Sequence, residues 1–173
     1  MSLYAPVRDD ELSLEPLVEA HREGLRAACA EDTEIWAIYP VSMVGDAFDP
    51  AFGAIIAAPN RLPFAILSGG TVAGTTSYWH DAANAVVEIG GTYIVPALRG
   101  SGVNARLKRL MLDRAFGLGI RRVEFRIDTR NTRSIAAVEK LGAKRDGVLR
   151  QNRVTWTGHV RDTAVYSLLA GEW

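Results

Sequence analysis

The sequence has little cysteine and no long apolar run. Cys29 is the only cysteine among 173 residues, so the chain cannot form an internal disulfide, which is typical of proteins in a reducing compartment. No apolar segment approaches the roughly 20 residues of a transmembrane helix. Met1–Pro6 lacks the basic and apolar regions of a signal peptide. We therefore expect a cytoplasmic protein with no membrane partner.

Histidine is also scarce, with three scattered residues. Three histidines and one cysteine offer none of the spacings that metal sites use, so we expect no metal. His80 and His159 fall at a predicted strand end and a predicted hairpin tip, where histidine is more often structural than catalytic. Cys29 is not expected to be a nucleophile, because buried cysteine behaves mostly as a small apolar residue.

The net charge is zero, but the charge is unevenly spread along the chain. Residues 99–161 hold 16 Lys and Arg against five Asp and Glu, whereas residues 1–98 hold four against 13. This asymmetry fits a polyanionic ligand on one side and a cationic substrate on the other, and it fits solvated helix and hairpin faces equally well. The basic residues alternate with apolar ones and form no arm, so nucleic acid is not an expected partner.

The segment Val86–Asn104 has the pattern of a strand, a turn and a helix start. Val86–Val95 is rich in β-branched and aromatic residues, and Pro96 cannot continue a sheet ladder. Gly100-Ser101-Gly102 allows unusual dihedral angles, and apolar residues at helical spacing follow it. A glycine turn before a helix can present free N–H groups to a phosphate, with Arg99 adding charge. Many such turns are only turns, so the spacing leaves both interpretations open.

Hydrophobic periodicity predicts the other elements. Four helices are expected, over Val18–Ala30, Asp49–Pro59, Val103–Gly119 and Asn131–Gly142. Besides Val86–Val95, strands are expected over Leu12–Pro16, Phe64–Leu67, Thr71–Trp79, Arg121–Asp128, Val148–Trp156 and Val160–Leu169. Only Val86–Asp128 forms a β-α-β crossover, which requires parallel strands. We therefore expect one α/β (α+β mixed) domain over residues 1–173, with a mixed, mostly antiparallel sheet of about seven strands and helices on both faces.

A dinucleotide site is an alternative for the glycine turn. Gly100-x-Gly102-x-x-Ala105 fits the fingerprint, and Asp128 could serve as the acid that binds the ribose. That fold needs several crossover units, whereas these glycines follow antiparallel hairpins in mid-chain. A dinucleotide oxidoreductase is therefore disfavoured, and it would be recognised by its binding of NAD.

Several motifs in one order resemble the GNAT N-acetyltransferase superfamily. Arg99-x-x-Gly102 after Ile94-Val95-Pro96 is similar to its acetyl-CoA signature, and Asn131–Ser134 with Glu139–Ala143 is similar to its next helix. Segments that resemble the RimJ/RimL-type branch are Glu88-Ile89-Gly90, Gly147–Arg150 and Arg161–Ser167. The resemblance covers nearly the whole chain and implies a single GNAT domain with its αβα layers.

The resemblance implies that acetyl-CoA is the co-substrate. Backbone groups of Ile94 and Val95 would pair with its pantetheine arm, and one N–H would polarise the thioester carbonyl. Asn131 and Ser134 would hold its other side, unless they only cap a helix. The N–H groups that would bind the pyrophosphate belong to Arg99, Gly100, Ser101, Gly102, Val103 and Asn104.

Three positions depart from the family pattern. Asn104 replaces Gly or Ala, so its side chain either touches the phosphates or points outward, and Ala143 replaces a common Phe. Val138 stands where many members carry a tyrosine that protonates the departing thiolate. The thiolate would then leave without a donor or take its proton from water. Val138 also keeps open a second hypothesis, an acyl-CoA-binding regulatory module without catalysis.

The implied reaction is direct attack of a neutral amine, from a protein N-terminus or a small molecule, on the thioester. An α-amino group with a pKa near 7.7–8.0 loses its proton at pH 7 for about 1–1.4 kcal/mol, against about 4–5 kcal/mol for lysine. Glu88 is the candidate base, acting through a water, and a structural carboxylate is the alternative. Trp36, Tyr39, Trp79 and Trp156 could line an acceptor pocket or pack in the core. The apolar C-terminal hairpin could pair across a homodimer.

Overall fold

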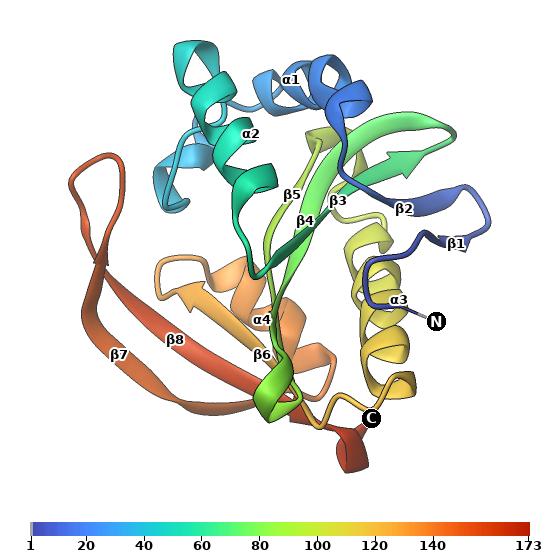
Figure 1. Cartoon of the computed structure of the whole chain (residues 1–173). Coiled ribbons are helices and arrows are strands. Elements are labelled where there is room, and N and C mark those ends of the chain that lie inside the picture. Colours follow the sequence, from blue (N-terminus) through green and yellow to red (C-terminus); the bar gives the residue numbers. More distant parts are fainter. Residues whose placement is uncertain (1) are drawn as a thin grey trace.

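The computed structural model describes residues 2–173 (Figure 1). Its strands are β1 (Val7–Asp9), β2 (Leu12–Pro16), β3 (Arg61–Ser68), β4 (Thr71–Asp81), β5 (Val86–Ile94), β6 (Arg122–Asp128), β7 (Lys144–Val154) and β8 (Val160–Leu169). Its α-helices are α1 (Arg22–Ala30), α2 (Phe48–Ala57), α3 (Val103–Gly117) and α4 (Thr132–Lys140). The strands form one sheet in the order β1-β2-β3-β4-β5-β6-β8-β7. Within residues 2–173 no helix is long and apolar enough to span a membrane.

Strand pairing follows the predicted mixed pattern. Six neighbouring pairs are antiparallel, and β5 and β6, which α3 connects, are parallel. The expected mixed fold with a mostly antiparallel sheet is therefore confirmed, with eight strands instead of about seven. The additional strand, β1, has only three residues, two of them charged. β7 begins at Lys144 instead of Val148, because pairing with β8 holds the polar segment Lys144–Gly147 in an extended conformation.

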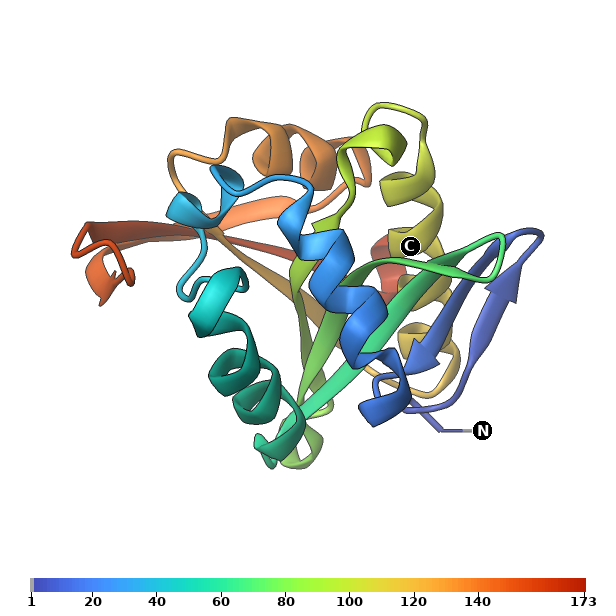
Figure 2. The same cartoon turned by 90° about the horizontal axis from the view of Figure 1, so that it is seen from above.

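Two apolar cores lie on opposite faces of the sheet (Figures 1 and 2). α3 and α4 contribute Leu107 and Val138 to the first core. α1 and α2 contribute Leu25 and Phe48 to the second, where Tyr93 of β5 also packs. The sheet thus separates the two helix pairs, as the prediction of helices on both faces required.

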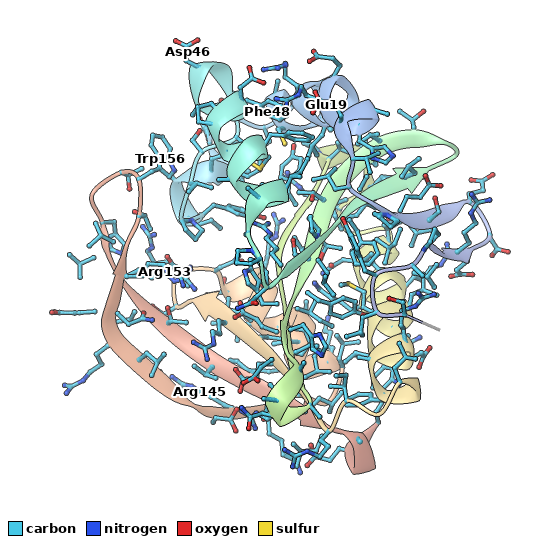
Figure 3. All side chains as sticks on the ribbon, in the orientation of Figure 1. Glu19, Asp46, Phe48, Arg145, Arg153 and Trp156 are labelled. Carbon is cyan, nitrogen blue, oxygen red and sulfur yellow. The ribbon has the colours of Figure 1, made fainter. Side chains whose placement is uncertain are left out.

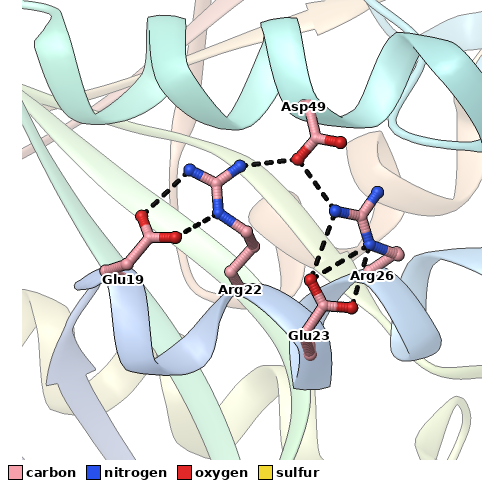
Figure 4. A network of polar contacts seen from close by, with 5 residues as sticks. All are labelled: Glu19, Arg22, Glu23, Arg26 and Asp49. Carbon is pink, nitrogen blue, oxygen red and sulfur yellow. Dashed lines mark hydrogen bonds and ion pairs between the residues drawn. The ribbon is translucent and has the colours of Figure 1, made fainter.

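A charge network joins α1 to α2 (Figure 4). Asp49 accepts hydrogen bonds from Arg22 (2.6 Å) and Arg26 (2.8 Å). These two arginines hold the pKa of the Asp49 carboxyl below its usual value. Each guanidinium also lies over a phenyl ring of α2, 4.3 Å from the Phe52 centroid for Arg22 and 4.4 Å from the Phe48 centroid for Arg26. The network fixes how the helix pair sits on β3 and β4.

Helical cover on the α1–α2 side stops at β5. α1 packs on β4 and α2 on β3, whereas β6 and β8 turn polar side chains to this side. Arg126 pairs with Val165 and Asp128 with Thr163, and directly paired residues share one face of a sheet. Arg161, two residues before Thr163, lies on the same face and bonds to its hydroxyl. The functional site is built where this polar face meets the end of β5.

Candidate functional site

The site begins where two parallel strands separate. β5 and β6 pair at only three positions, from Val86 with Arg122 to Glu88 with Glu124. Beyond Glu88 the two strands diverge, so their carboxyl ends are not bonded to each other. A divergence of this kind leaves the edge of β5 open to a ligand that can pair as an extra strand.

The open edge of β5 retains one free donor near its end. Val95 N–H bonds to Ala73 O on β4 (2.9 Å), and Val95 O accepts from Leu98 N–H (3.1 Å). Successive N–H groups of a strand point to opposite edges, so Ile94 N–H points into the divergence. Ile94 O accepts from the Arg99 side chain (2.9 Å). Of the two residues expected to pair with pantetheine, Val95 has its main-chain groups engaged within the protein, and Ile94 retains its N–H.

The glycine loop that follows holds a run of free amides at the start of α3. Gly100 and Gly102 have φ of +77° and +88°, a region that side chains other than glycine rarely adopt. Ser101 bonds through its hydroxyl to Leu98 O (2.7 Å) and receives a long 3.4 Å contact from Val103 N–H. Within the described chain the N–H groups of Gly100, Ser101, Gly102 and Asn104 have no acceptor. Free amides at the positive end of a helix dipole are groups that can bind an anion.

Both the main-chain amide and the guanidinium of Arg99 form hydrogen bonds within the protein. Its N–H bonds to Pro96 O (3.0 Å), so the free amides begin at Gly100 and not at Arg99. Its guanidinium binds Ile94 O and the Asp32 carboxylate, and it lies 5.6 Å from the Tyr93 ring centroid. Hydrogen bonding to Arg99 lowers the pKa of Asp32. Arg99 therefore holds the loop against the end of β5.

Two buried polar atoms in this region have no partner among residues 2–173. They are Nη2 of Arg99 and Oδ1 of Asn104. Buried polar atoms normally find a hydrogen-bond partner, and an orphaned donor and acceptor are places that a ligand or water would satisfy. The Asn104 side chain therefore does not simply point outward, which was one of the two expectations for it.

Asn131 and Ser134 lie at the start of α4, after β6. Asn131 Oδ1 accepts from Ser134 N–H (3.0 Å), which makes Asn131 the N-cap of α4. This is the structural role foreseen as the alternative for the pair. The preceding turn is held by Asp128, which is 3% exposed and binds Arg130 through N–H (2.9 Å) and the guanidinium (2.7 Å). Asp128 is thus committed to the turn and not presented to a ribose.

Glu88 lies at the point of divergence, in a shallow groove of about 450 Å³ that also includes Trp79 and His80. Its nearest counter-ion is Arg126, at 3.5 Å. Burial raises the pKa of Glu88, although the neighbouring arginines act in the opposite direction. A carboxylate with a raised pKa at the edge of a groove has the properties of a general base. The structure therefore allows the proposed role, and the ion pair provides the structural alternative.

Two glycines make room beside Glu88. A Cβ on Gly90 would lie 3.1 Å from Glu88 Oε1, and one on Gly91 would lie 2.9 Å from the Arg61 guanidinium. Arg61 stacks 4.5 Å over the Trp79 ring centroid and donates to Ser77 Oγ (2.8 Å). Trp79 is thus fixed by a stacked arginine against a bulge in β5.

The other aromatic residues join the segment before α2 to the rest of the site. Trp156, which Figure 3 labels at the β7–β8 tip, donates through Nε1 to Trp36 O (2.7 Å). The Tyr39 hydroxyl donates to Thr92 O on β5 (2.5 Å), and burial raises its pKa. Trp36 itself is 1% exposed and packs in the second core. Trp36 is therefore a core residue, while Tyr39 and Trp156 brace the walls of the site.

The structure also adds a residue that the sequence did not single out. Lys108 of α3 is 6% exposed, and its Nζ donates to Thr92 Oγ1 (2.6 Å) at the bulge of β5. Burial lowers the pKa of Lys108 to about 7. A signal was present, because Lys108 interrupts an apolar stripe with Leu107, Met111 and Leu112 on a predicted helix.

Neither cysteine nor histidine forms a second centre within the described residues. Cys29 is buried, and burial raises the pKa of its thiol to about 12. Over residues 2–173 no group of three or more His, Cys, Asp or Glu side chains could hold a metal ion. His80 lines the Glu88 groove, and His159 accepts through its main-chain oxygen from Thr155 N–H (2.9 Å) at the hairpin tip.

Comparison with known proteins gives a consistent picture. Residues 26–143 match the acetyltransferase (GNAT) family, while a search of curated proteins finds no match. A probable GNAT-family acetyltransferase from Chromobacterium violaceum ATCC 12472 is 32% identical over 98% of this chain and 88% of its own, with a TM-score of 0.89. A candidate acetyltransferase from T. thermophilus is 36% identical over 97% of this chain and 90% of its own, with a TM-score of 0.87.

A more distant structure shares the fold alone. Mycobacterium smegmatis RimJ, solved in complex with CoA-disulfide, is 19% identical over 97% of this chain and 87% of its own, with a TM-score of 0.80. At that identity the likeness does not distinguish one branch from another.

Proposed function

The chain belongs to the acetyltransferase (GNAT) family, and we propose that it transfers the acetyl group of acetyl-CoA to a primary amine. The amine belongs to a protein N-terminus or to a small molecule. The observation that carries the proposal is the run of unengaged amides from Gly100 to Asn104, next to the open edge of β5. That RimJ was solved with a CoA derivative supports a CoA ligand for this fold. The RimJ/RimL-type branch stays a prediction.

The chain's own groups suffice to hold the co-substrate. The amides of Gly100, Ser101, Gly102 and Asn104 would bind the pyrophosphate, and Asn104 Oδ1 nearby would accept a hydrogen bond from a donor of the ligand or from a water. Ile94 N–H would bind the pantetheine arm along β5. The thioester supplies an activated acyl group, and the divergence of β5 from β6 provides the opening through which an amine reaches it.

The amine must arrive without its proton. Glu88 would accept that proton, directly or through a water, and its raised pKa brings it closer to neutrality than an ordinary carboxyl group. The position at which many family members carry a tyrosine acid is occupied here by Val138. Its side chain is 3% exposed, packs in the first core and has no proton to donate. The thiolate would therefore leave unprotonated or be protonated by water.

The test combines binding with turnover. Coenzyme A binding is measured by calorimetry, and thiol release from acetyl-CoA is followed across a panel of α-amino and side-chain amines. We expect saturable binding and amine-dependent thiol release. Protein that neither binds coenzyme A nor releases thiol with any amine would overturn the proposal.

Val138 supports a second candidate, a module that binds acyl-CoA without catalysis. This candidate predicts coenzyme A binding without turnover for any amine, and binding that is unchanged in Glu88→Gln. The enzyme predicts that Glu88→Gln binds coenzyme A normally but loses thiol release. One pair of measurements on two proteins thus separates the candidates.

A further inference from the structure

Four arginines, contributed by β3, β6, β7 and β8, lie near enough to Glu88 to interact with its charge. We call Arg61, Arg126, Arg153 and Arg161 the arginine face. Of these four arginines only Arg126 lies within 4.0 Å of carboxylates, those of Glu88 and Glu124, and Glu124 is shared with Arg122. Within residues 2–173 the other three form no ion pair. The positive charges on this face therefore exceed the negative ones.

Arg161 is buried and has no ion pair within 4.0 Å among the described residues, although the more distant carboxylates of Asp128 and Glu88 favour its charge. It is 5% exposed, and its guanidinium donates to Thr163 Oγ1 (2.9 Å) and to Arg126 O (3.1 Å). Both acceptors are uncharged groups. Burying a cation without a counter-ion is costly, and proteins normally pair such a charge. Desolvation by burial lowers the pKa of Arg161, but arginine remains charged at neutral pH.

A second arginine stands beside it. Arg153 of β7 is the direct register partner of Arg161 on β8, so the two side chains share one face of the sheet. Like charges in directly opposed positions destabilise a strand pair. The hairpin is bent next to this pair, where Asn152 accepts from Thr163 Oγ1 (2.7 Å) and the amide of Gln151 bonds to Asp162. The register thus places two arginines side by side on one face of the hairpin, and neither forms an ion pair within residues 2–173.

We propose, on the basis of the proposed function, that the amine acceptor carries an anionic group, either a carboxylate or a phosphate. Arg153 and Arg161 bind this anionic group while the amine of the acceptor faces Glu88. Planar guanidinium groups bind both anions in a bidentate manner. This is the opposite of the cationic substrate that the charge asymmetry alone left open.

The register sets the length of such an acceptor. Glu88 pairs with Glu124, and Arg126, whose carbonyl binds Arg161, lies two residues further along β6. Two residues of a strand span roughly 6.6–6.8 Å. The amine and the anion should therefore be separated by a spacer of about four or five carbons, longer than in an α-amino acid.

The experiment uses matched pairs of acceptors with the full chain and saturating acetyl-CoA. Linear ω-amino acids with two to eight carbons between the amine and the carboxylate are compared with n-alkylamines of equal length, and ω-aminoalkylphosphonates form a third arm. We expect kcat/KM from thiol release to be at least tenfold higher for one anionic series, with its maximum at an intermediate length. The better of the two anionic arms identifies carboxylate or phosphate.

Variants then assign the preference to the arginines. Arg161→Gln and the more exposed Arg153→Gln should each reduce the acid-to-amine ratio of kcat/KM about tenfold, through a higher KM for the acid. Arg145→Gln is the matched control, because Arg145 lies on β7 but pairs with Tyr166, whose side chain faces α4 (Figure 3). It should leave the ratio unchanged. If Arg161→Gln fails to fold, Arg153→Gln still decides.

Three outcomes are distinguishable. Equal or better turnover of neutral amines overturns this inference and leaves the proposed function standing. A ratio that is unchanged in both arginine variants also overturns it. If no amine of any series reacts, the proposed function fails, and the inference fails with it.

Discussion

In the proposed function, the two sides of the divergence between β5 and β6 bind their ligands with different parts of the chain. On the cofactor side the available groups are main-chain amides, from Gly100 to Asn104 and at Ile94. On the acceptor side they are charged side chains, Glu88 and the arginine face, contributed by five different strands. Main-chain recognition depends on a local conformation, whereas side-chain recognition depends on strand register. The cofactor side should therefore respond to backbone changes and the acceptor side to charge changes.

Glu88→Gln should have the largest effect and tests the acceptor side. A general base contributes typically 10²–10⁴-fold, so we expect kcat at pH 7 to fall at least 100-fold while coenzyme A affinity stays the same. Because burial raises the pKa of Glu88, lowering the pH should reduce the wild-type rate at pH values above those at which an ordinary carboxyl group titrates. The pH–rate profile of the variant should lack this acidic decline.

Glu139→Gln is the control for this change, since Glu139 lies on α4 and accepts from the Tyr166 hydroxyl (2.8 Å), away from the groove. The same raised pKa has a consequence for stability. The folded protein holds the Glu88 proton to higher pH than the unfolded chain, so this group's contribution declines as pH rises through that window. A normal kcat of Glu88→Gln would mean that Glu88 is not the general base of the acceptor side.

Gly102→Val tests the cofactor side. Its φ of +88° strains a β-branched residue, although a Cβ would meet no protein atom within 4 Å. We expect coenzyme A to bind 10- to 100-fold more weakly by calorimetry. Gly119→Val is matched to it, because Gly119 has φ +85°, equally open surroundings, and a position at the other end of the same helix. Equal losses in both variants would mean that strain, not the loop amides, explains the effect.

Lys108→Met tests the buried contact between α3 and β5, the strand that borders both sides. The unfolded lysine has a pKa of 10.5 and the folded one about 7. Between these values the unfolded chain binds a proton that the folded chain lacks, so stability should rise with pH, by up to about 1.4 kcal/mol per unit. Urea unfolding at pH 7 and pH 8.5 should show this rise in the wild type and not in Lys108→Met. A rise of equal size in both proteins would contradict the assignment.

Trp156→Phe should have the smallest effect. Phenylalanine keeps an aromatic ring at the hairpin tip but cannot donate to Trp36 O. We expect the KM for the acceptor to rise about threefold, since a net hydrogen bond contributes about 0.5–1.5 kcal/mol, with coenzyme A affinity unchanged. A larger change in coenzyme A affinity than in acceptor KM would mean that the tip belongs to the cofactor side.

The same contrast explains what could be predicted from the sequence. Gly100 and Gly102 precede a helical pattern, so a candidate phosphate-binding turn can be predicted from the residue spacing within one short segment. The β-α-β crossover was predicted from the same segment and is confirmed by the parallel pairing of β5 with β6. The hydrogen bonds from Val95 N–H to Ala73 O and from Arg99 N–H to Pro96 O could not be predicted, because they depend on where the neighbouring strand and turn lie.

The arginine face could not be found in this way. Arg126, Arg153 and Arg161 belong to alternating strand patterns, and the sequence does not reveal which face each strand turns inward. That information lies in the register and in the order β6-β8-β7, in which the last strand enters between two earlier ones. Lys108 was missed for a simpler reason, since a single lysine in an apolar stripe is easily assigned to solvent.

The position of β8 has a consequence for synthesis on the ribosome. The β5–loop–α3 segment is complete once residue 117 has emerged, but β7 has no neighbour until residues 160–169 are available to pair with it and with β6. A nascent chain can therefore form the turn that we propose for the pyrophosphate before β7 and β8 complete the proposed acceptor side.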